Sequence, residues 1–260
     1  MALNKYSAFY YGHTITKSNK YLNLGEAYID ANQRLAVLPI GSFTLTEFGN
    51  RVAAAMNTAG NQVYTVVLDR NTRKFTISAP NNFELLIDTG DQKAVSIFSL
   101  LGFTGSDRAG SNSYTANLES GSAYITQTPL KDFSDFDKNR EKAEAQVKTT
   151  PSGVTEVISY STLEKMKCSF PLITNYVPQR YIRSTNTGVE EVLDFLNYAI
   201  GKAPMEFIYD YQQPNNFKPI ILDKTKESSK GVGFELKERV KDSLPGYYEI
   251  SGLVFLKIEV

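Results

Sequence analysis

The sequence is poor in the residue types that most often carry catalysis or bind metals. Its 260 residues include one cysteine, Cys168, one histidine, His13, and no tryptophan. A single cysteine excludes an internal disulfide framework and a zinc site built from several cysteines. A Ser or Cys nucleophile would need His13 as its base, and a lone histidine in a strand-like stretch is usually structural. We therefore predict no catalytic, metal-binding or cofactor-binding residues, and we expect that the chain is not an enzyme.

The charge balance and the lack of long apolar runs exclude two further kinds of partner. The 28 basic side chains are balanced by 28 acidic ones, so there is no basic excess to bind a phosphate backbone. No apolar run approaches the roughly 20 residues that span a bilayer, and the first residues lack the apolar core of a secretory signal. We expect no nucleic-acid partner, no membrane segment and a chain that is made in the cytoplasm and not processed.

One acidic stretch, "DFSDFDKN", partly matches a calcium-binding loop. Asp135, Asp137 and Asn139 have the spacing of the first ligands of such a loop. Arg140 stands where the turn glycine is required, and Gln146 stands where the bidentate glutamate is required. We therefore predict a solvated acidic segment here and no calcium site.

The residues that are abundant favour β-structure. There are 16 tyrosines and 15 phenylalanines, and most apolar residues fall in short alternating runs, which are typical of strands. Only two segments have helical periodicity. The predicted fold class is α+β, mainly β.

The first helix is predicted by the spacing of two polar residues. Thr44 and Glu47 have capping-box spacing, in which the hydroxyl and the carboxylate each accept a hydrogen bond from a free N–H of the first turn. The apolar residues Leu45, Phe48, Val52 and Met56 follow on one face. Gly60 suits a left-handed residue after the helix, so we predict that the helix ends by about residue 59.

This helix opens a small unit that we assign to residues 41–126. Two β-branched or aromatic runs, residues 63–68 and 75–78, flank the polar turn "DRNTRK" and predict a hairpin packed on the helix. Further strand-like stretches with Gly, Ser and Asn between them follow. The prediction is a small α/β module, a helix on antiparallel hairpins.

The second helix is predicted after residue 187. Thr187 and Glu190 repeat the capping-box spacing. An apolar stripe follows, which comprises Val192, Leu193, Phe195, Leu196, Ala199 and Ile200. Gly201 and Pro204 then favour an end to the helix.

The remaining segments suggest a division into domains. Residues 127–153 are highly charged with almost no apolar periodicity, which favours an exposed connector or arm. Strand-like runs fill most of residues 154–260 around the second helix. We group residues 1–40 with 154–260 as one mainly β domain, into which the small module is inserted.

Several motifs in residues 41–126 resemble a module of virion proteins from tailed phages. They are the opening "GSFTLTEF", the hairpin "TRKFTIS" and the turn "SLLGFTGSD" before a tyrosine-bearing strand. The flanks, with "STLEKMKCSFPLITNYVP" and "LPGYYEISGLVFLKIEV", resemble the distal tail proteins found at phage tail tips and baseplates.

This resemblance implies a fold, a function and partners. The flanking domain would be a β-sandwich or barrel-like tail-ring domain with one packed helix, interrupted by the virion module. The chain would form a homo-oligomeric ring, with a hexamer as the expected stoichiometry, that joins the tail tube to other tail-tip or baseplate proteins in the virion. The alternative is a carbohydrate-binding host-recognition module of the tail.

Overall fold

The structure is a computed structural model of the chain. It describes residues 8–30, 32–125, 138–141, 146–149, 155–158, 163–174, 188–201, 204–208, 210, 212–222, 235–238 and 247–258. The fold is mainly β, with antiparallel sheets and few helices, so the predicted fold class is confirmed. The described strands close no barrel. The chain divides into an N-terminal unit, Ala2–Thr128 with Gly201–Pro219, and a C-terminal unit, Pro129–Ile200 with Ile220–Glu259.

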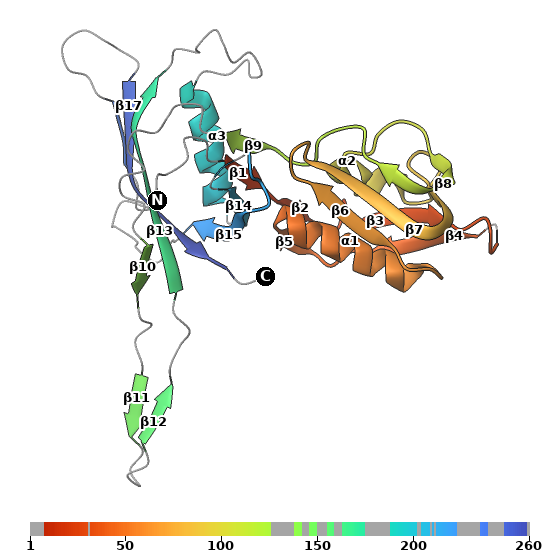
Figure 1. The fold of residues 1–260 in the computed structure, drawn as a ribbon, viewed down its shortest axis with the longest axis horizontal. Helices are drawn as coiled ribbons and strands as arrows, with labels where there is room; N and C mark the ends of the chain where they lie inside the picture. Colours follow the sequence, from red (N-terminus) through yellow and green to blue (C-terminus); the bar gives the residue numbers. More distant parts are fainter. Residues whose placement is uncertain are drawn as a thin grey trace. The chain divides into compact units, whose positions relative to one another are not determined.

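A five-stranded sheet is the framework of the N-terminal unit (Figure 1). Its strands are β3 (Tyr21–Gly25), β4 (Gln33–Val37), β6 (Thr65–Asp69), β7 (Lys74–Leu85) and β8 (Arg108–Thr115). The long strand β7 pairs antiparallel with β3, β6 and β8, while β4 pairs with β3. The predicted hairpin is therefore present as β6 and β7, joined by the polar turn.

Helix α1 (Leu45–Ala59) packs on this sheet and begins as the sequence predicts. Thr44 Oγ1 accepts a hydrogen bond from Glu47 N at 3.2 Å, and Glu47 Oε2 accepts one from Thr44 N at 3.3 Å. The helix ends at Ala59, as predicted, but Gly60 has φ −91° and is extended rather than left-handed. A Cβ on Gly60 would lie 2.6 Å from the Tyr64 ring. Close packing, not a left-handed turn, is thus the reason for glycine here.

The core of the N-terminal unit draws on both sides of the predicted boundary at residue 41. Phe48, Val52 and Met56 of α1 are fully buried with Phe75 and Ile77 of β7. The same cluster includes five residues that precede the boundary: Ile15, Leu22, Leu24, Ala36 and Leu38. Each Leu or Ile side chain among them contributes about 1.5–3 kcal/mol. The compact unit therefore includes β3 and β4, which the sequence-based division grouped with residues 154–260.

Shorter elements complete the N-terminal unit. Strand β1 (Ala8–Tyr11) pairs with β9 (Ala123–Ile125) on one side and β14 (Met205–Ile208) on the other. Strand β2 (His13–Ile15) pairs with β5 (Gly41–Phe43). The short helices η1 (Lys93–Val95) and α2 (Phe98–Leu101) follow β7, and α2 ends at Gly102, whose φ of 83° is left-handed.

The C-terminal unit contains the second predicted helix and a sheet centred on two long strands. Strand β13 (Leu163–Thr174) pairs with β17 (Tyr247–Lys257) and β10 (Lys138–Glu141). Strand β17 also pairs with β16 (Glu235–Glu238) and with the end of β15 (Phe217–Leu222). Helix α3 (Gly188–Ile200) buries Phe195, whose ring lies 6.2 Å from that of Phe255. Leu196 and Ala199 are buried too, as the stripe predicts. Thr187 and the side chain of Leu193 lie outside the described part.

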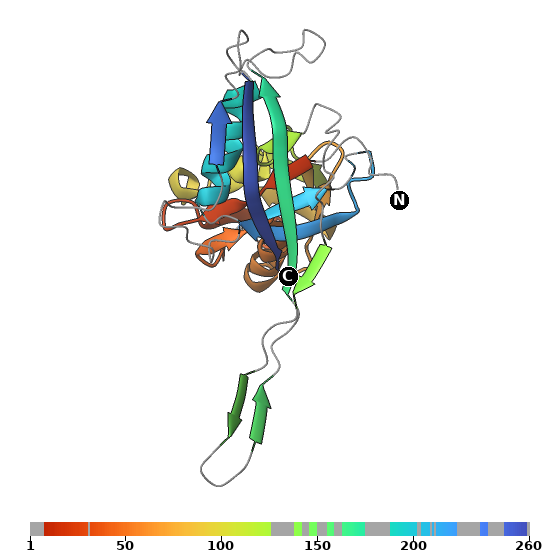
Figure 2. The same cartoon turned by 90° about the vertical axis from the view of Figure 1, so that its left-hand side faces the viewer.

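Two further strands lie in and after the segment predicted as a charged connector, residues 127–153. Strand β11 (Gln146–Thr149) and strand β12 (Thr155–Ile158) lie side by side as an antiparallel pair (Figure 2). Their register, from Gln146↔Ile158 to Thr149↔Thr155, continues that of β10 and β13, from Lys138↔Met166 to Glu141↔Leu163. Part of the predicted connector thus consists of paired strands.

Candidate interaction surface

The single histidine is a buried structural residue. His13 in β2 is 9% exposed, and its Nε2 lies 2.9 Å from Ser120 Oγ. The Ser120 hydroxyl donates to the carbonyl of Leu100 at 2.6 Å, so the histidine Nε2–H is the donor to Ser120. Burial lowers the pKa of His13 to about 4, which keeps the ring neutral at pH 7. Its role in the fold is to link β2 to the end of α2.

The other residues that we considered for chemistry are not brought together in the described structure. Cys168 lies in β13, but its side chain is outside the described part. Asn139 and Arg140 belong to strand β10 and Gln146 to β11, while Asp135 and Asp137 are outside the described residues. Among the residues that are described, no three His, Cys, Asp or Glu side chains lie close enough to hold a metal ion.

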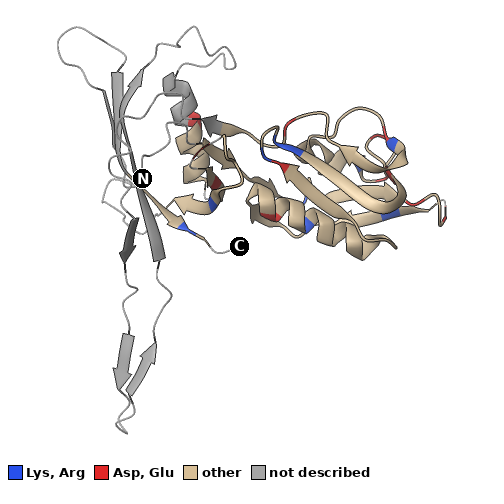
Figure 3. Cartoon of the chain, in the orientation of Figure 1, with Lys and Arg blue, Asp and Glu red and all other residues tan. Residues whose placement is uncertain are grey.

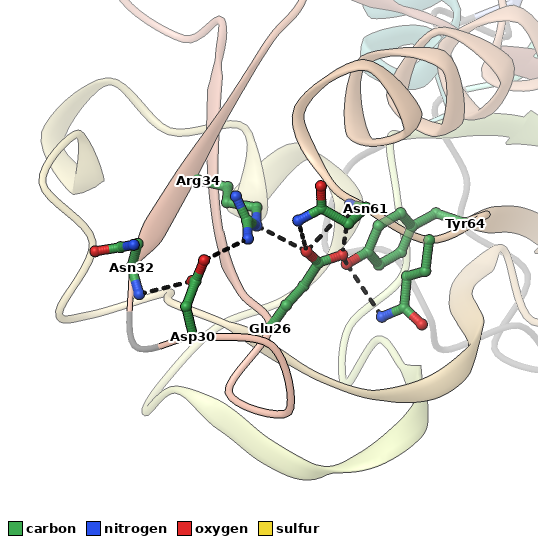
Figure 4. A network of polar contacts seen from close by, with 7 residues as sticks. Glu26, Asp30, Asn32, Arg34, Asn61 and Tyr64 are labelled. Atoms are coloured by element: carbon green, nitrogen blue, oxygen red, sulfur yellow. Dashed lines mark hydrogen bonds and ion pairs between the residues drawn. The ribbon is translucent and has the colours of Figure 1, made fainter.

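A buried carboxylate, Glu26, forms the centre of one polar network (Figure 4). It is fully buried, and its Oε1 accepts hydrogen bonds from Asn61 N at 2.9 Å and Tyr64 Oη at 2.8 Å. Its Oε2 accepts from Asn61 Nδ2 at 3.0 Å and Arg34 Nε at 2.7 Å. Burial alone would raise the pKa of Glu26, but the hydrogen bonds from Asn61, Tyr64 and Arg34 outweigh it and lower that pKa. Both oxygens are occupied, so this carboxylate stabilises the fold.

A second buried ion pair joins the turn after β6 to strand β14. Arg70 Nη1 lies 2.5 Å from Glu206 Oε2, and the two side chains are 7% and 0% exposed. Glu206 Oε1 also accepts from Thr46 N in the first turn of α1 at 2.7 Å. The Arg70 guanidinium lies 3.5 Å from the centroid of the Phe217 ring, and the Arg70 carbonyl accepts from Tyr10 Oη. These contacts satisfy both charges and attach β14 to the rest of the unit.

Sequence reasoning predicted neither network, because the partners are far apart in the chain. Glu26 and Asn61 are 35 positions apart, and Arg70 and Glu206 are 136 positions apart. The only local signal is Glu206 itself, a charged residue in the otherwise apolar run "MEFI". A charge in such a run indicates a buried partner, but not which one.

A groove lies between β4 and α1 on the surface of the N-terminal unit. It has a volume of about 350 Å³. Its lining comprises Leu35, Val37, Pro39, Arg51, Ala54, Ala55, Thr58 and Ala59. In Figure 3 most of β4 and α1 is tan, the colour of residues other than Lys, Arg, Asp and Glu. Arg51 is the one charged residue of the lining; it lies 5.7 Å from the Phe43 ring and forms no ion pair with a described residue.

Strand β4 borders the groove and has a free edge, since it pairs only with β3 among the described strands. Leu38 N donates to Lys20 O at 2.9 Å, so the backbone groups of Leu38 face β3. Along an antiparallel strand, residues alternate between directing their backbone groups toward the paired strand and away from it. Gln33, Leu35 and Val37 therefore direct their N–H and C=O groups away from β3. Leu35 is 40% exposed and Val37 48%, so the edge offers both hydrogen bonds and apolar area.

Comparisons with known proteins do not identify a partner for this surface. No protein-family model matches the sequence, and no curated protein was found that matches it. Within the described residues, no helix is long and apolar enough to cross a membrane. The groove and the β4 edge together are the candidate interaction surface.

Proposed function

We propose that the chain is a structural component of a phage virion. In this proposal it forms a ring at the distal tail or baseplate and joins the tail tube to the host-facing tip proteins. The observation that carries the proposal is the resemblance of residues 41–126 to a phage virion module, with flanks that resemble distal tail proteins.

The polar networks are compatible with a structural role. In the described residues, the buried carboxylates of Glu26 and Glu206 are used in hydrogen bonds and ion pairs that hold strands and helix together. An active-site acid would need a proton-transfer partner in a substrate and an accessible oxygen. The β4 edge, in contrast, is accessible and apolar, as expected of a surface that binds another protein chain.

The proposal implies self-association and can be tested in solution. The purified chain should form one closed oligomer, which we expect to be a hexamer, with a mass that is constant over a range of concentrations. Light scattering and native mass spectrometry measure this mass, and electron microscopy shows whether the particle is a ring. A chain that stays monomeric at every concentration, alone and with tail-tube protein, would contradict the proposal.

A further inference from the structure

Among the described strands, the β11–β12 hairpin adds to no larger sheet, and β4 has a free edge next to an apolar groove. We propose that strand β12 of one copy adds to the free edge of β4 in a second copy as an extra antiparallel strand. The Glu156 carboxylate of β12 would then pair with Arg51 beside the groove. The inference rests on the proposed homo-oligomer, for which it names the contact.

The donor is the hairpin of β11 and β12. These strands form a two-stranded sheet of four residue pairs and pair with no other described strand. An isolated two-stranded hairpin is marginally stable in water, and a third strand or a packed surface is needed to stabilise it. The hairpin would therefore be stabilised if it added to the free edge of another sheet.

The acceptor is the edge of β4, which has the length and the groups that such a strand needs. It has five residues, against the four of β12. Three of its residues, Gln33, Leu35 and Val37, direct backbone groups outward, as derived above from the bond between Leu38 and Lys20. In strand addition, these main-chain groups supply affinity and the neighbouring pockets supply specificity.

Charge selects β12 rather than β11 as the added strand. Strand β12 reads T-E-V-I, with one acidic residue, while β11 reads Q-V-K-T, with one basic residue. The only charged residue that lines the acceptor groove is Arg51, and it has no ion-pair partner among the described residues. Lys148 and Glu156 lie opposite each other in the hairpin, so the strand that is added decides which of the two charges lies nearer Arg51, and β12 brings the acidic one.

Because donor and acceptor are different segments, two copies can exchange β12 reciprocally in a two-fold dimer, or successive copies can join head-to-tail, which is the arrangement that the proposed ring requires. Each copy offers one β12 and one β4, so association can continue around a ring, whereas a two-fold contact would end at a dimer. This geometry allows a complementation test. A copy that can only donate and a copy that can only accept should form a pair and no larger species.

The experiment uses two variants of the full chain and measures their mass by light scattering. In the acceptor-blocked variant, Leu35→Pro removes an outward N–H, which an edge strand tolerates. In the donor-less variant, a Gly-Ser linker replaces residues 146–158. Each variant alone should be monomeric, and a 1:1 mixture should form a dimer that contains one copy of each. Val67→Lys changes a valine on β6 that is 61% exposed, more than Leu35 or Val37, and should assemble as the intact chain does.

Melting curves show whether the variants fold. If the Leu35→Pro variant does not fold, a double variant with Leu35→Lys and Val37→Lys replaces it. Arg51→Glu should weaken assembly at least about tenfold, and Glu156→Arg in the same chain should restore it. A mixture that stays monomeric, or a single variant that assembles like the intact chain, overturns the inference. If the intact chain forms a ring in either case, the proposed function stands without this contact. An intact chain that is monomeric also overturns the inference.

Discussion

Replacing Arg70 by methionine should strongly destabilise the N-terminal unit. The substitution leaves the Glu206 carboxylate with no cationic partner while its side chain is 0% exposed. Only the hydrogen bond from Thr46 N, at 2.7 Å, would remain of its described contacts. The methionine keeps part of the packing on Phe217 but loses the cation–π contact.

The size of the effect follows from the burial of the pair. Removing one partner of a buried ion pair costs about 3–5 kcal/mol, which is a large part of the roughly 5–15 kcal/mol that stabilises a typical domain. For a domain of this size each kcal/mol changes the melting temperature by about 2–4 °C. We expect the melting temperature of Arg70→Met to fall by about 6–20 °C.

Two further variants separate the pair from general packing loss. Arg70→Met combined with Glu206→Met should recover most of the lost stability, because an apolar pair of similar volume avoids the buried charge. Arg73→Met removes a more exposed pair, in which Glu119 is 51% exposed, and should cost less than about 1 kcal/mol. Urea titration of all variants gives the free energies of unfolding. If Arg70→Met loses under about 1 kcal/mol, or if the double variant is as unstable as the single one, the reasoning is refuted.

Three other changes to the chain test the interpretations of His13, of Glu26 and of the boundary at residue 41. The pKa of His13 is about 4 in the folded chain against an ordinary 6.5, so as the pH is lowered the unfolded chain binds a proton at His13 before the folded chain does. The free energy of unfolding therefore falls as the pH is lowered from 6.5 to 4. His13→Gln should remove this loss, which a plot of melting temperature against pH measures. Glu26 has a lowered pKa, so its contribution is lost only below its ordinary value of 4.5; Glu26→Gln should cost about 2 kcal/mol at pH 7 in urea titrations and less in acid. Replacing residues 41–126 by a Gly/Ser linker should expose Leu22 and Leu24 and abolish the hydrogen-exchange protection of β3; a protected β3 would instead favour the boundary at residue 41.

The sequence predicts α1 well because its signals are local. Thr44 and Glu47 are three residues apart, and the hydrogen bonds that they make are determined by that spacing in any helix start. The prediction of a left-handed Gly60 is wrong: the residue is extended, and Asn61 N directly after it donates to Glu26, a distant partner that a local rule does not include.

The extent of the N-terminal unit is harder to predict, because alternation does not say which sheet a strand joins. Leu22 and Leu24 alternate as in any half-buried strand, and nothing local associates them with Phe48 or Phe75. The two polar networks have the same limitation, since Glu26 and Glu206 find their partners only after the chain has folded. Such partners become predictable only when the pairing of strands is known.

Strand β4 shows the opposite of the usual arrangement in a half-buried strand. Its larger apolar residues, Leu35 and Val37, are 40% and 48% exposed, while the small Ala36 between them is 1% exposed. Alternation alone would place the larger side chains in the core. Because more than half of each side chain is already buried, covering the rest against a partner would add roughly 1 kcal/mol each, and the same residues direct their backbone groups outward. An edge that combines both features is a liability in a monomer. The proposed contact with a second copy would cover both features.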